Sequence, residues 1–128
     1  MSEGKVFIID DDPVSVQLFT TALQRAGFIV ESTTQVIGTT AIINKFSPDI
    51  VLLDVMMPAL SGEKLVQILK QGVRSQPVVI LLSNKNEDEL KKLVQGSGAD
   101  DYITKLSGPS ALLRKVNEHI WRRKAGEA

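Results

Sequence analysis

Several residue types and patterns are missing from this sequence of 128 residues, and each absence excludes a class of function. The chain has no cysteine, which rules out disulfide bonds, thiolate catalysis and thiolate metal sites. Its 15 Lys and Arg residues balance its 15 Asp and Glu residues, so no net charge attracts it to nucleic acid or to an anionic membrane. No apolar run reaches the ~18 residues that span a bilayer, and none has the form of a signal peptide. We therefore expect a soluble, cytoplasmic protein.

The sequence does contain three short, continuous apolar runs, which are Val6–Ile9, Ile50–Leu53 and Val78–Leu82. They are rich in Val and Ile and do not alternate with polar residues, which is typical of strands buried on both faces of a parallel sheet. Two weaker strand candidates are Phe28–Ser32 and Asp101–Lys105. Since 43% of the residues are hydrophobic, the chain can bury a core of ordinary size for one domain.

Apolar residues between the first two predicted strands recur at helical spacing. We expect Asp12 to cap this helix, Pro13 to occupy its first turn and Gly27 to end it. Its predicted core-facing side consists of six apolar residues, Val14, Leu18, Phe19, Ala22, Leu23 and Ala26.

Four more helices are predicted, at Val36–Phe46, Gly62–Gln71, Glu87–Gln95 and Pro109–Lys124. The last is the clearest, because basic residues near its end complement the helix dipole. Its expected inward-facing residues are Leu112, Leu113, Val116 and Ile120. His119, the only histidine, is expected at the surface or at an interface.

Strand and helix thus alternate five times along the chain. Because parallel strands need crossover connections of one handedness, the pattern predicts a doubly wound α/β sandwich around one parallel sheet. We expect one domain over residues 1–124, followed at 125–128 by a polar tail or the start of a linker. Trp121, near the end of this domain, is expected to pack against the core.

Polar side chains follow four of the five predicted strands at their carboxyl ends, where the functional crevice of an open α/β sheet lies. They are Asp10, Asp11 and Asp12 after the first strand, Asp54 after the third, Ser83 after the fourth and Lys105 after the fifth. Each alone has a structural explanation as a cap, a turn residue or a solvated charge. Because the fold brings them to one edge, a shared chemical role is favoured.

Such a cluster of carboxylates needs a positive partner. Two carboxylates ~5 Å apart repel by roughly 3 kcal/mol at an effective dielectric constant near 20. A divalent cation relieves this repulsion, and Mg²⁺ suits a site with few protein oxygens and several waters. Carboxylates, Mg²⁺, a lysine and a hydroxyl together suit phosphoryl transfer. We infer an aspartate that accepts a phosphoryl group, and the chemistry alone does not say which aspartate.

Four segments, in this order, carry a resemblance to a known family: VFIIDDDP, PDIVLLDVMMPALSG, VVILLSN and GADDYITK. From about Lys5 to Ile120 the chain resembles the response-regulator receiver domains of two-component signalling, of the chemotaxis-regulator type. The resemblance implies a flavodoxin-like (βα)5 sandwich whose five-stranded parallel sheet has the order 2-1-3-4-5.

The resemblance also implies roles for individual residues. Asp54 would be the phosphoacceptor and a Mg²⁺ ligand, Asp11 a direct ligand, and Asp10 a ligand acting mainly through water. Met56 would contribute its backbone carbonyl to the metal. Asp12 lies outside the acid pair of the family, so its expected role as a helix cap stands.

On the phosphoryl side of the implied site, Ser83 would hydrogen-bond the phosphoryl group and Lys105 would pair with it. Phosphorylation would draw Ser83 inward and let Tyr102 rotate, which would switch the face formed by the fourth helix, fifth strand and fifth helix. The implied partners are a histidine kinase or histidine phosphotransfer protein and a downstream protein or output domain. We expect no nucleic-acid or membrane binding, a monomer or phosphorylation-dependent dimer, and no enzyme activity beyond self-phosphorylation and self-dephosphorylation.

One position departs from the pattern of the family. Leu106 follows Lys105 where the family usually has proline joined through a cis peptide, and Ser107 replaces a common aromatic. A non-proline cis bond costs ~3 kcal/mol, so either the bond is trans and the loop is rebuilt or that strain is retained. We expect Lys105 to be less firmly placed than usual, and phosphorylation to be slower or weaker than with proline.

Two alternatives stay open from the sequence. A haloacid-dehalogenase-like phosphatase would use the D-x-D spacing of Asp10 and Asp12, and Asp100 and Asp101 would mimic its later acidic pair. In that family the lysine should precede those acids, whereas Lys105 follows them. The second alternative is a receiver-like protein-binding module that works without phosphorylation.

Overall fold

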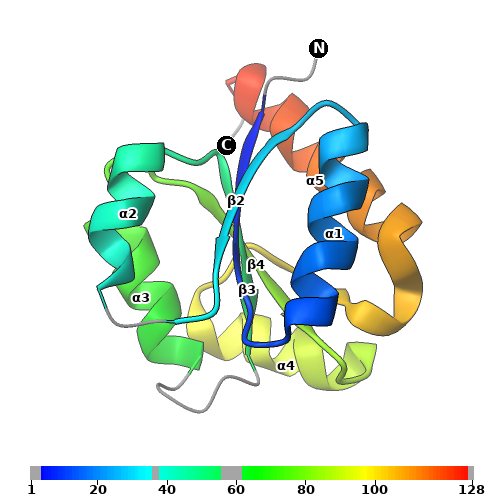
Figure 1. Cartoon of the computed structure of the whole chain (residues 1–128). Helices are drawn as coiled ribbons and strands as arrows, with labels where there is room; N and C mark the ends of the chain where they lie inside the picture. Colours follow the sequence, from blue (N-terminus) through cyan, green and yellow to red (C-terminus); the bar gives the residue numbers. More distant parts are fainter. Residues whose placement is uncertain (1–3, 36–37, 56–61, 127–128) are drawn as a thin grey trace.

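The computed structural model describes residues 4–35, 38–55 and 62–126. Five parallel strands form one sheet in the order β2-β1-β3-β4-β5, which confirms the expected doubly wound topology. Figure 1 shows this sheet nearly edge-on between two layers of helices. The strands are β1 Lys5–Ile9, β2 Ile29–Thr33, β3 Ile50–Asp54, β4 Val78–Ser83 and β5 Asp101–Thr104.

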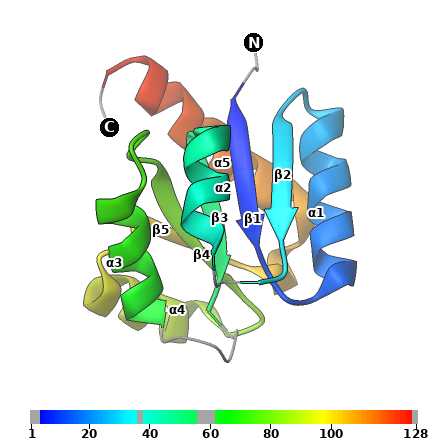
Figure 2. The same ribbon diagram turned by 60° about the vertical axis from the view of Figure 1, so that its left-hand side comes forward.

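The helices cover both faces of the sheet. Helices α1 and α5 pack on one face and α2, α3 and α4 on the other (Figures 1 and 2). Their bounds are α1 Pro13–Arg25, α2 Thr39–Phe46, α3 Gly62–Gly72, α4 Glu87–Ser97 and α5 Gly108–Lys124, with the 3₁₀ turn η1 Lys105–Ser107 before α5. The second helix was expected from residue 36, and residues 36–37 lie outside the described ranges.

Alternate residues of the central strands supply two separate cores. Ile8 of β1 and Leu52 of β3 face α1 and α5, whereas Phe7 and Leu53 face the opposite helices. All four are fully buried. Because both faces of the strands are covered, the runs Val6–Ile9, Ile50–Leu53 and Val78–Leu82 within these strands are apolar throughout, as predicted.

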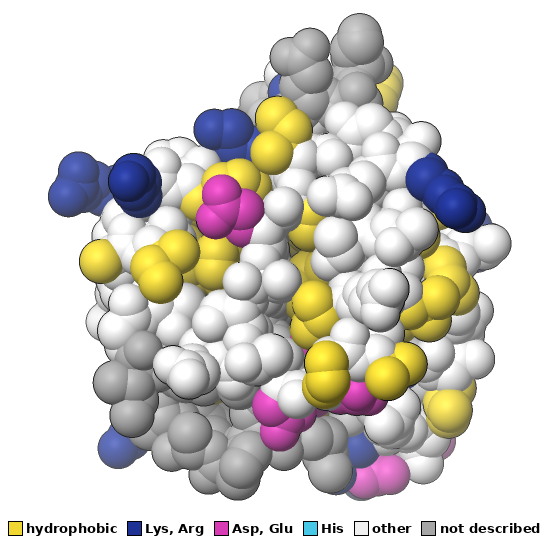
Figure 3. Space-filling view, in the orientation of Figure 1, with side chains coloured by type: hydrophobic (Ala, Val, Ile, Leu, Met, Phe, Trp, Pro, Cys, Tyr) yellow, Lys and Arg dark blue, Asp and Glu magenta, His cyan; other side chains and the backbone are white. Residues whose placement is uncertain are grey.

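The buried face of α1 differs from the predicted one. Phe19 and Leu23 are buried and Val16 packs beside them, but Val14 is 73% exposed and Leu18 is 49% exposed. At 3.6 residues per turn, Val14 and Leu18 lie on the side of the helix opposite the stripe formed by the other three. Figure 3 shows hydrophobic side chains at the surface over the lower part of α1. The expectation that all of these residues face the core was therefore wrong.

The ends of α1 and α5 bring two further corrections and one confirmation. Ala26, expected to face the core, is exposed just after α1 ends. Trp121, which was expected to pack, is 72% exposed and lines a shallow groove with Phe28. The inward-facing set of α5 is confirmed, since Leu112, Val116 and Ile120 are buried and Leu113 packs against them.

Arg123 in the last turn of α5 holds three segments together at the amino-terminal ends of the strands. Its Nε donates to Asp49 Oδ1 at 3.1 Å, and its other nitrogens donate to the carbonyls of Ser75 and Gln76. The second oxygen of Asp49 accepts from the Lys5 amide at 2.9 Å. The guanidinium thus joins α5 to the loops that precede β3 and β4.

Candidate functional site

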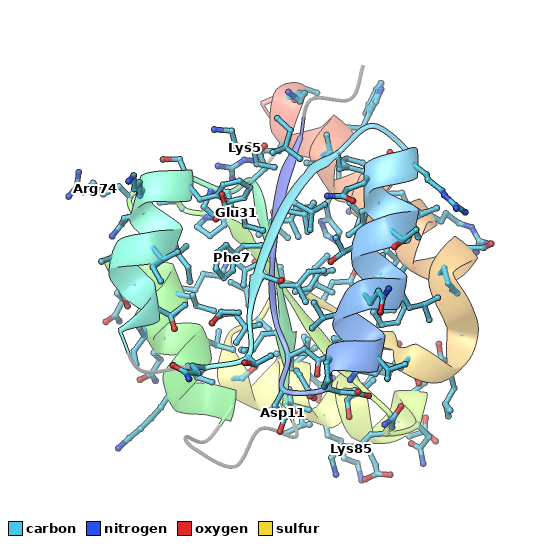
Figure 4. All side chains as sticks on the ribbon, viewed as in Figure 1. Lys5, Phe7, Asp11, Glu31, Arg74 and Lys85 are labelled. Carbon is cyan, nitrogen blue, oxygen red and sulfur yellow. The ribbon has the colours of Figure 1, made fainter. Side chains whose placement is uncertain are left out.

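The structure gathers the polar residues that follow the strands at one edge of the sheet. Asp10 follows β1, Asp54 ends β3, Ser83 ends β4 and Lys105 follows β5. In Figure 4 this edge lies at the bottom, where the labels of Asp11 and Lys85 stand. The sheet topology alone produces this arrangement, because the carboxyl ends of parallel strands point the same way.

Three of these side chains are withdrawn from water. Asp10 and Ser83 are fully buried and Asp54 is 3% exposed. The ammonium of Lys105, whose side chain is 8% exposed, lies 2.7 Å from Asp10 Oδ2 and 3.7 Å from Asp54 Oδ2. Lys105 therefore bridges two buried carboxylates that would otherwise repel each other.

The loop after β1 is fixed by the acids themselves. Asp10 Oδ1 accepts from the Asp12 amide at 3.0 Å. Asp12 caps α1 as predicted, since its carboxylate accepts from the Val14 amide and from the Ser15 hydroxyl, each at 3.0 Å. The hydrogen bond from Ser15, followed by that from Val14, holds the pKa of Asp12 below its usual value. The turn between β1 and α1 therefore both positions Asp10 in the site and caps the first helix.

Asp10, Asp11 and Asp54 form a group that can hold a metal ion. Each offers a carboxylate oxygen, and these oxygens lie within 4.8 Å of one another. Three carboxylates and one lysine leave a charge of −3 + 1 = −2. Asp10 Oδ2 is buried and accepts no well-aligned hydrogen bond from the described residues, although Lys105 lies beside it. A hard divalent cation fits such oxygen donors, while Met56, the expected carbonyl ligand, lies outside the described residues.

The loop after β5 is rebuilt around a trans peptide. The described residues contain no cis peptide bond, so Lys105 and Leu106 are joined in trans. Lys105 begins a 3₁₀ turn instead of ending the strand as predicted. Thr104 Oγ1 accepts from the Leu106 amide at 3.3 Å. This role of Thr104 was not predicted from the sequence. A threonine hydroxyl that accepts from the backbone amide two residues later is nevertheless a recognisable local motif.

The opposite, amino-terminal end of β5 carries a second charged cluster. Asp101 accepts from Lys115 Nζ at 2.9 Å, and its other oxygen lies 2.8 Å from His119 Nε2. Lys115 also donates to the Tyr102 carbonyl at 2.6 Å and stands 4.2 Å from the centre of the Tyr102 ring. His119, expected at the surface or at an interface, has a side chain only 11% exposed and lies against Asp101 of β5.

The pKa of Asp101 reflects this surrounding. Burial alone would raise it, but the hydrogen bonds from His119, Lys115 and the Tyr102 amide outweigh burial and lower the pKa to about 2. Asp101 is therefore ionised at neutral pH and holds β5 to α5 through both of its oxygens.

The acidic pair required by the phosphatase alternative lies at the wrong edge. Asp101 is the first residue of β5, and the Asp100 amide donates to the Val79 carbonyl near the start of β4. The Asp100 carboxylate accepts from the Val79 amide at 2.8 Å and pairs with Lys70. Both acids thus lie at the amino-terminal end of β5, whereas Asp10 and Asp54 lie at the carboxyl ends of β1 and β3, and both acids play structural roles.

Fold and site together define a class of protein, the doubly wound α/β domains with a cluster of acids and a lysine at the carboxyl edge of the sheet. A family profile described as the response regulator receiver domain matches residues 6–117. The chain belongs to this family. Within the described residues, none of the helices has the length and apolarity needed to cross a membrane.

Individual relatives agree with this assignment. Protein PilH of Pseudomonas aeruginosa is 30% identical over 115 residues, which cover 89% of this chain and 95% of PilH. The DNA-binding dual master transcriptional regulator RpaA of Synechocystis is 32% identical over 92% of this chain and 49% of its own length. The chain thus spans about half the length of RpaA and of several other relatives.

Solved structures show the same architecture. The chemotaxis response regulator CheY4 of Vibrio cholerae superimposes with a TM-score of 0.79 at 26% identity, covering 91% of this chain and 98% of that chain. The predicted class, the sheet order and the resemblance to receiver domains are therefore confirmed.

Proposed function

We propose that this domain accepts a phosphoryl group on Asp54 and that Ser83 and Lys105 bind that group. The observation that carries the proposal is the position of Lys105, whose ammonium lies 3.7 Å from Asp54 Oδ2 and 2.7 Å from Asp10 Oδ2, both of them buried acids at the same edge of the sheet as buried Ser83. A protein-binding module that is never phosphorylated has no use for so costly a cluster.

The donor is a phosphohistidine of a histidine kinase or histidine phosphotransfer protein. A carboxylate oxygen of Asp54 attacks phosphorus, an O–P bond forms, the P–N bond breaks, and the imidazole nitrogen keeps the electron pair. Lys105 balances charge that develops on the phosphoryl oxygens. The Ser83 hydroxyl, which now accepts from the Lys85 amide at 3.0 Å, is free to donate to a phosphoryl oxygen.

Asp10, Asp11 and Asp54 would hold Mg²⁺, with the carbonyl of Met56 as a further ligand outside the described residues. When bound, the metal neutralises charge on the acids and on the transferred group. Self-dephosphorylation by water at the same pocket completes the cycle, and no external substrate is turned over.

The output of the switch is the face made by α4, β5 and α5. Ser83 and Tyr102 lie on neighbouring strands, where Ser83 pairs with Thr104 and Tyr102 with Leu81. An acyl phosphate on Asp54 draws the Ser83 hydroxyl toward it and leaves room into which Tyr102 rotates. A downstream protein or an output domain then distinguishes the two forms of this face.

The test is intact-mass analysis after treatment with acetyl phosphate or phosphoramidate, with and without Mg²⁺. We expect the wild type to gain one phosphoryl group only when Mg²⁺ is present, and Asp54→Asn to gain none. Asp88→Asn is the matched control, because Asp88 is an exposed acid of α4. An Asn variant at position 54 labelled as fully as the wild type would contradict the assignment, and steady hydrolysis of a phosphate ester would favour the phosphatase.

A further inference from the structure

We propose that Thr104 is a positioning residue for Lys105, and that its hydroxyl compensates for the leucine at position 106. The inference rests on the proposed function, since it concerns how Lys105 reaches the pocket of Asp54. Unlike proline, Leu106 has a backbone N–H, and this amide is partly buried. A buried amide needs a hydrogen-bond acceptor. Thr104 Oγ1 accepts from the Leu106 amide at 3.3 Å, and Thr104 itself is only 8% exposed.

This hydrogen bond lies at the start of the turn that carries Lys105. Another lies at the other end, where the Gly108 amide donates to the Lys105 carbonyl. Gly108 has a φ of 81° and a ψ of 175°, a conformation open to glycine, and it lets α5 begin immediately. The backbone of Lys105 is thus held from both sides.

Side-chain packing does not fix the same turn. Leu106 is 74% exposed and Ser107 is also exposed, so neither side chain anchors the loop against the core. The direction in which the Lys105 side chain leaves the backbone therefore depends on the hydrogen bonds of the turn, together with the ion pairs that its ammonium makes with Asp10 and Asp54. The hydrogen bond accepted by Thr104 Oγ1 involves a side chain, so a substitution can remove it.

The position of Lys105 matters because its ammonium serves two carboxylates at once, Asp10 at 2.7 Å and Asp54 at 3.7 Å. A misplacement of about 1 Å in a reacting site can slow a reaction by ~100-fold. Loss of one hydrogen bond loosens the turn without removing the lysine, so we expect a smaller effect, a fall of ~10-fold in the maximal rate constant of phosphorylation.

The experiment is a double-mutant cycle of Thr104→Val and Leu106→Pro, with labelling by phosphoramidate at saturating Mg²⁺ followed by intact mass. Thr104→Val removes the hydroxyl at nearly constant volume and should lower the maximal rate constant, leaving the half-saturating donor concentration unchanged. Thr104→Ser keeps the hydroxyl and should stay within about twofold of the wild type. In the Leu106→Pro background no amide needs an acceptor, so Thr104→Val should change the rate by less than about twofold.

Ser97→Ala is the matched control, because Ser97 Oγ accepts from the Ala99 amide at 3.2 Å in the same local pattern at the end of α4. It should lower stability as Thr104→Val does and leave labelling unchanged. Mg²⁺ affinity, measured by calorimetry, should be no weaker in Thr104→Val than in the wild type, since the carboxylates are intact.

Equal slowing by Thr104→Val in both backgrounds, no slowing at all, or a parallel loss of Mg²⁺ affinity would overturn the positioning role. If Thr104→Val does not fold, hydrogen exchange of the Leu106 amide is measured in the wild type instead. Protection of this amide supports its hydrogen bond to Thr104, and exchange at the rate of an open loop overturns the positioning role. A wild type that takes up no phosphoryl group overturns the proposed function itself, an outcome distinct from each of these.

Discussion

Replacing Asp101 by asparagine removes the charge at the centre of the cluster that joins β5 to α5. The side chain of Asp101 is 23% exposed and lies between Lys115 at 2.9 Å and His119 at 2.8 Å. Asparagine has nearly the same shape, so packing is preserved. We expect the variant to fold and to lose stability, because Lys115 keeps its charge in a half-buried position without its carboxylate partner.

The size of the loss follows from the pKa of Asp101, which is about 2 in the folded protein against an ordinary value of 3.8. This difference corresponds to ~2 kcal/mol in favour of the folded state at neutral pH. Since the folded pKa is the lower one, the stabilisation is fully present above pH 3.8 and is lost as the pH falls toward 2. At pH 3 roughly half of it remains.

The assay is urea unfolding of the wild type and Asp101→Asn at pH 7 and at pH 3. We expect the two proteins to differ by ~2 kcal/mol at pH 7 and by about half as much at pH 3, with equal dependence on urea. Glu118→Gln, at an exposed acid of α5, serves as the control and should stay within about 0.5 kcal/mol of the wild type. A difference for Asp101→Asn that is absent at pH 7, or the same at both pH values, would refute the reasoning.

Two further predictions concern the pocket and its output. Leu106→Pro should label several-fold faster than the wild type with a small phosphodonor, because proline restricts the backbone next to Lys105; an unchanged or slower rate counts against this. Phosphorylation should shift the ring signals of Tyr102 in NMR spectra of the wild type and leave them unshifted in Ser83→Ala. Identical shifts in both proteins would show that the response of Tyr102 to phosphorylation does not depend on Ser83.

Features that depend on strand burial and chain direction could be predicted from the sequence. Continuous runs such as Val78–Leu82 can only be buried on both faces, so they identified the parallel sheet. Once the strands were known to be parallel, Asp10, Asp54 and Ser83 had to meet at one edge. The capping role of Asp12 was equally accessible, because it depends on residues within one helical turn.

Features that depend on tertiary contacts could not be predicted in this way. Val14 and Leu18 share the helical spacing of Phe19 and Leu23, and only the packing of α1 against the sheet decides which stripe is buried. The exposure of Trp121 likewise depends on where α5 ends relative to α1.

Charged pairs between distant segments were missed for a related reason. His119 and Asp101 are 18 residues apart, and nothing in either segment identifies the other as its partner. The spacing of Lys115 and His119 places both on one side of α5, which indicates a shared contact but not which residue makes it.

The contacts of Arg123 have a meaning for folding as well as for the finished structure. Its partners lie 74, 47 and 48 residues earlier in the chain, so the guanidinium can find them only after most of the domain is in place. Because these contacts are non-local, we expect the last turn of α5 to dock late in folding, after β3 and β4 have paired. Shortening α5 by this one turn would release the two loops that precede β3 and β4 at the same time.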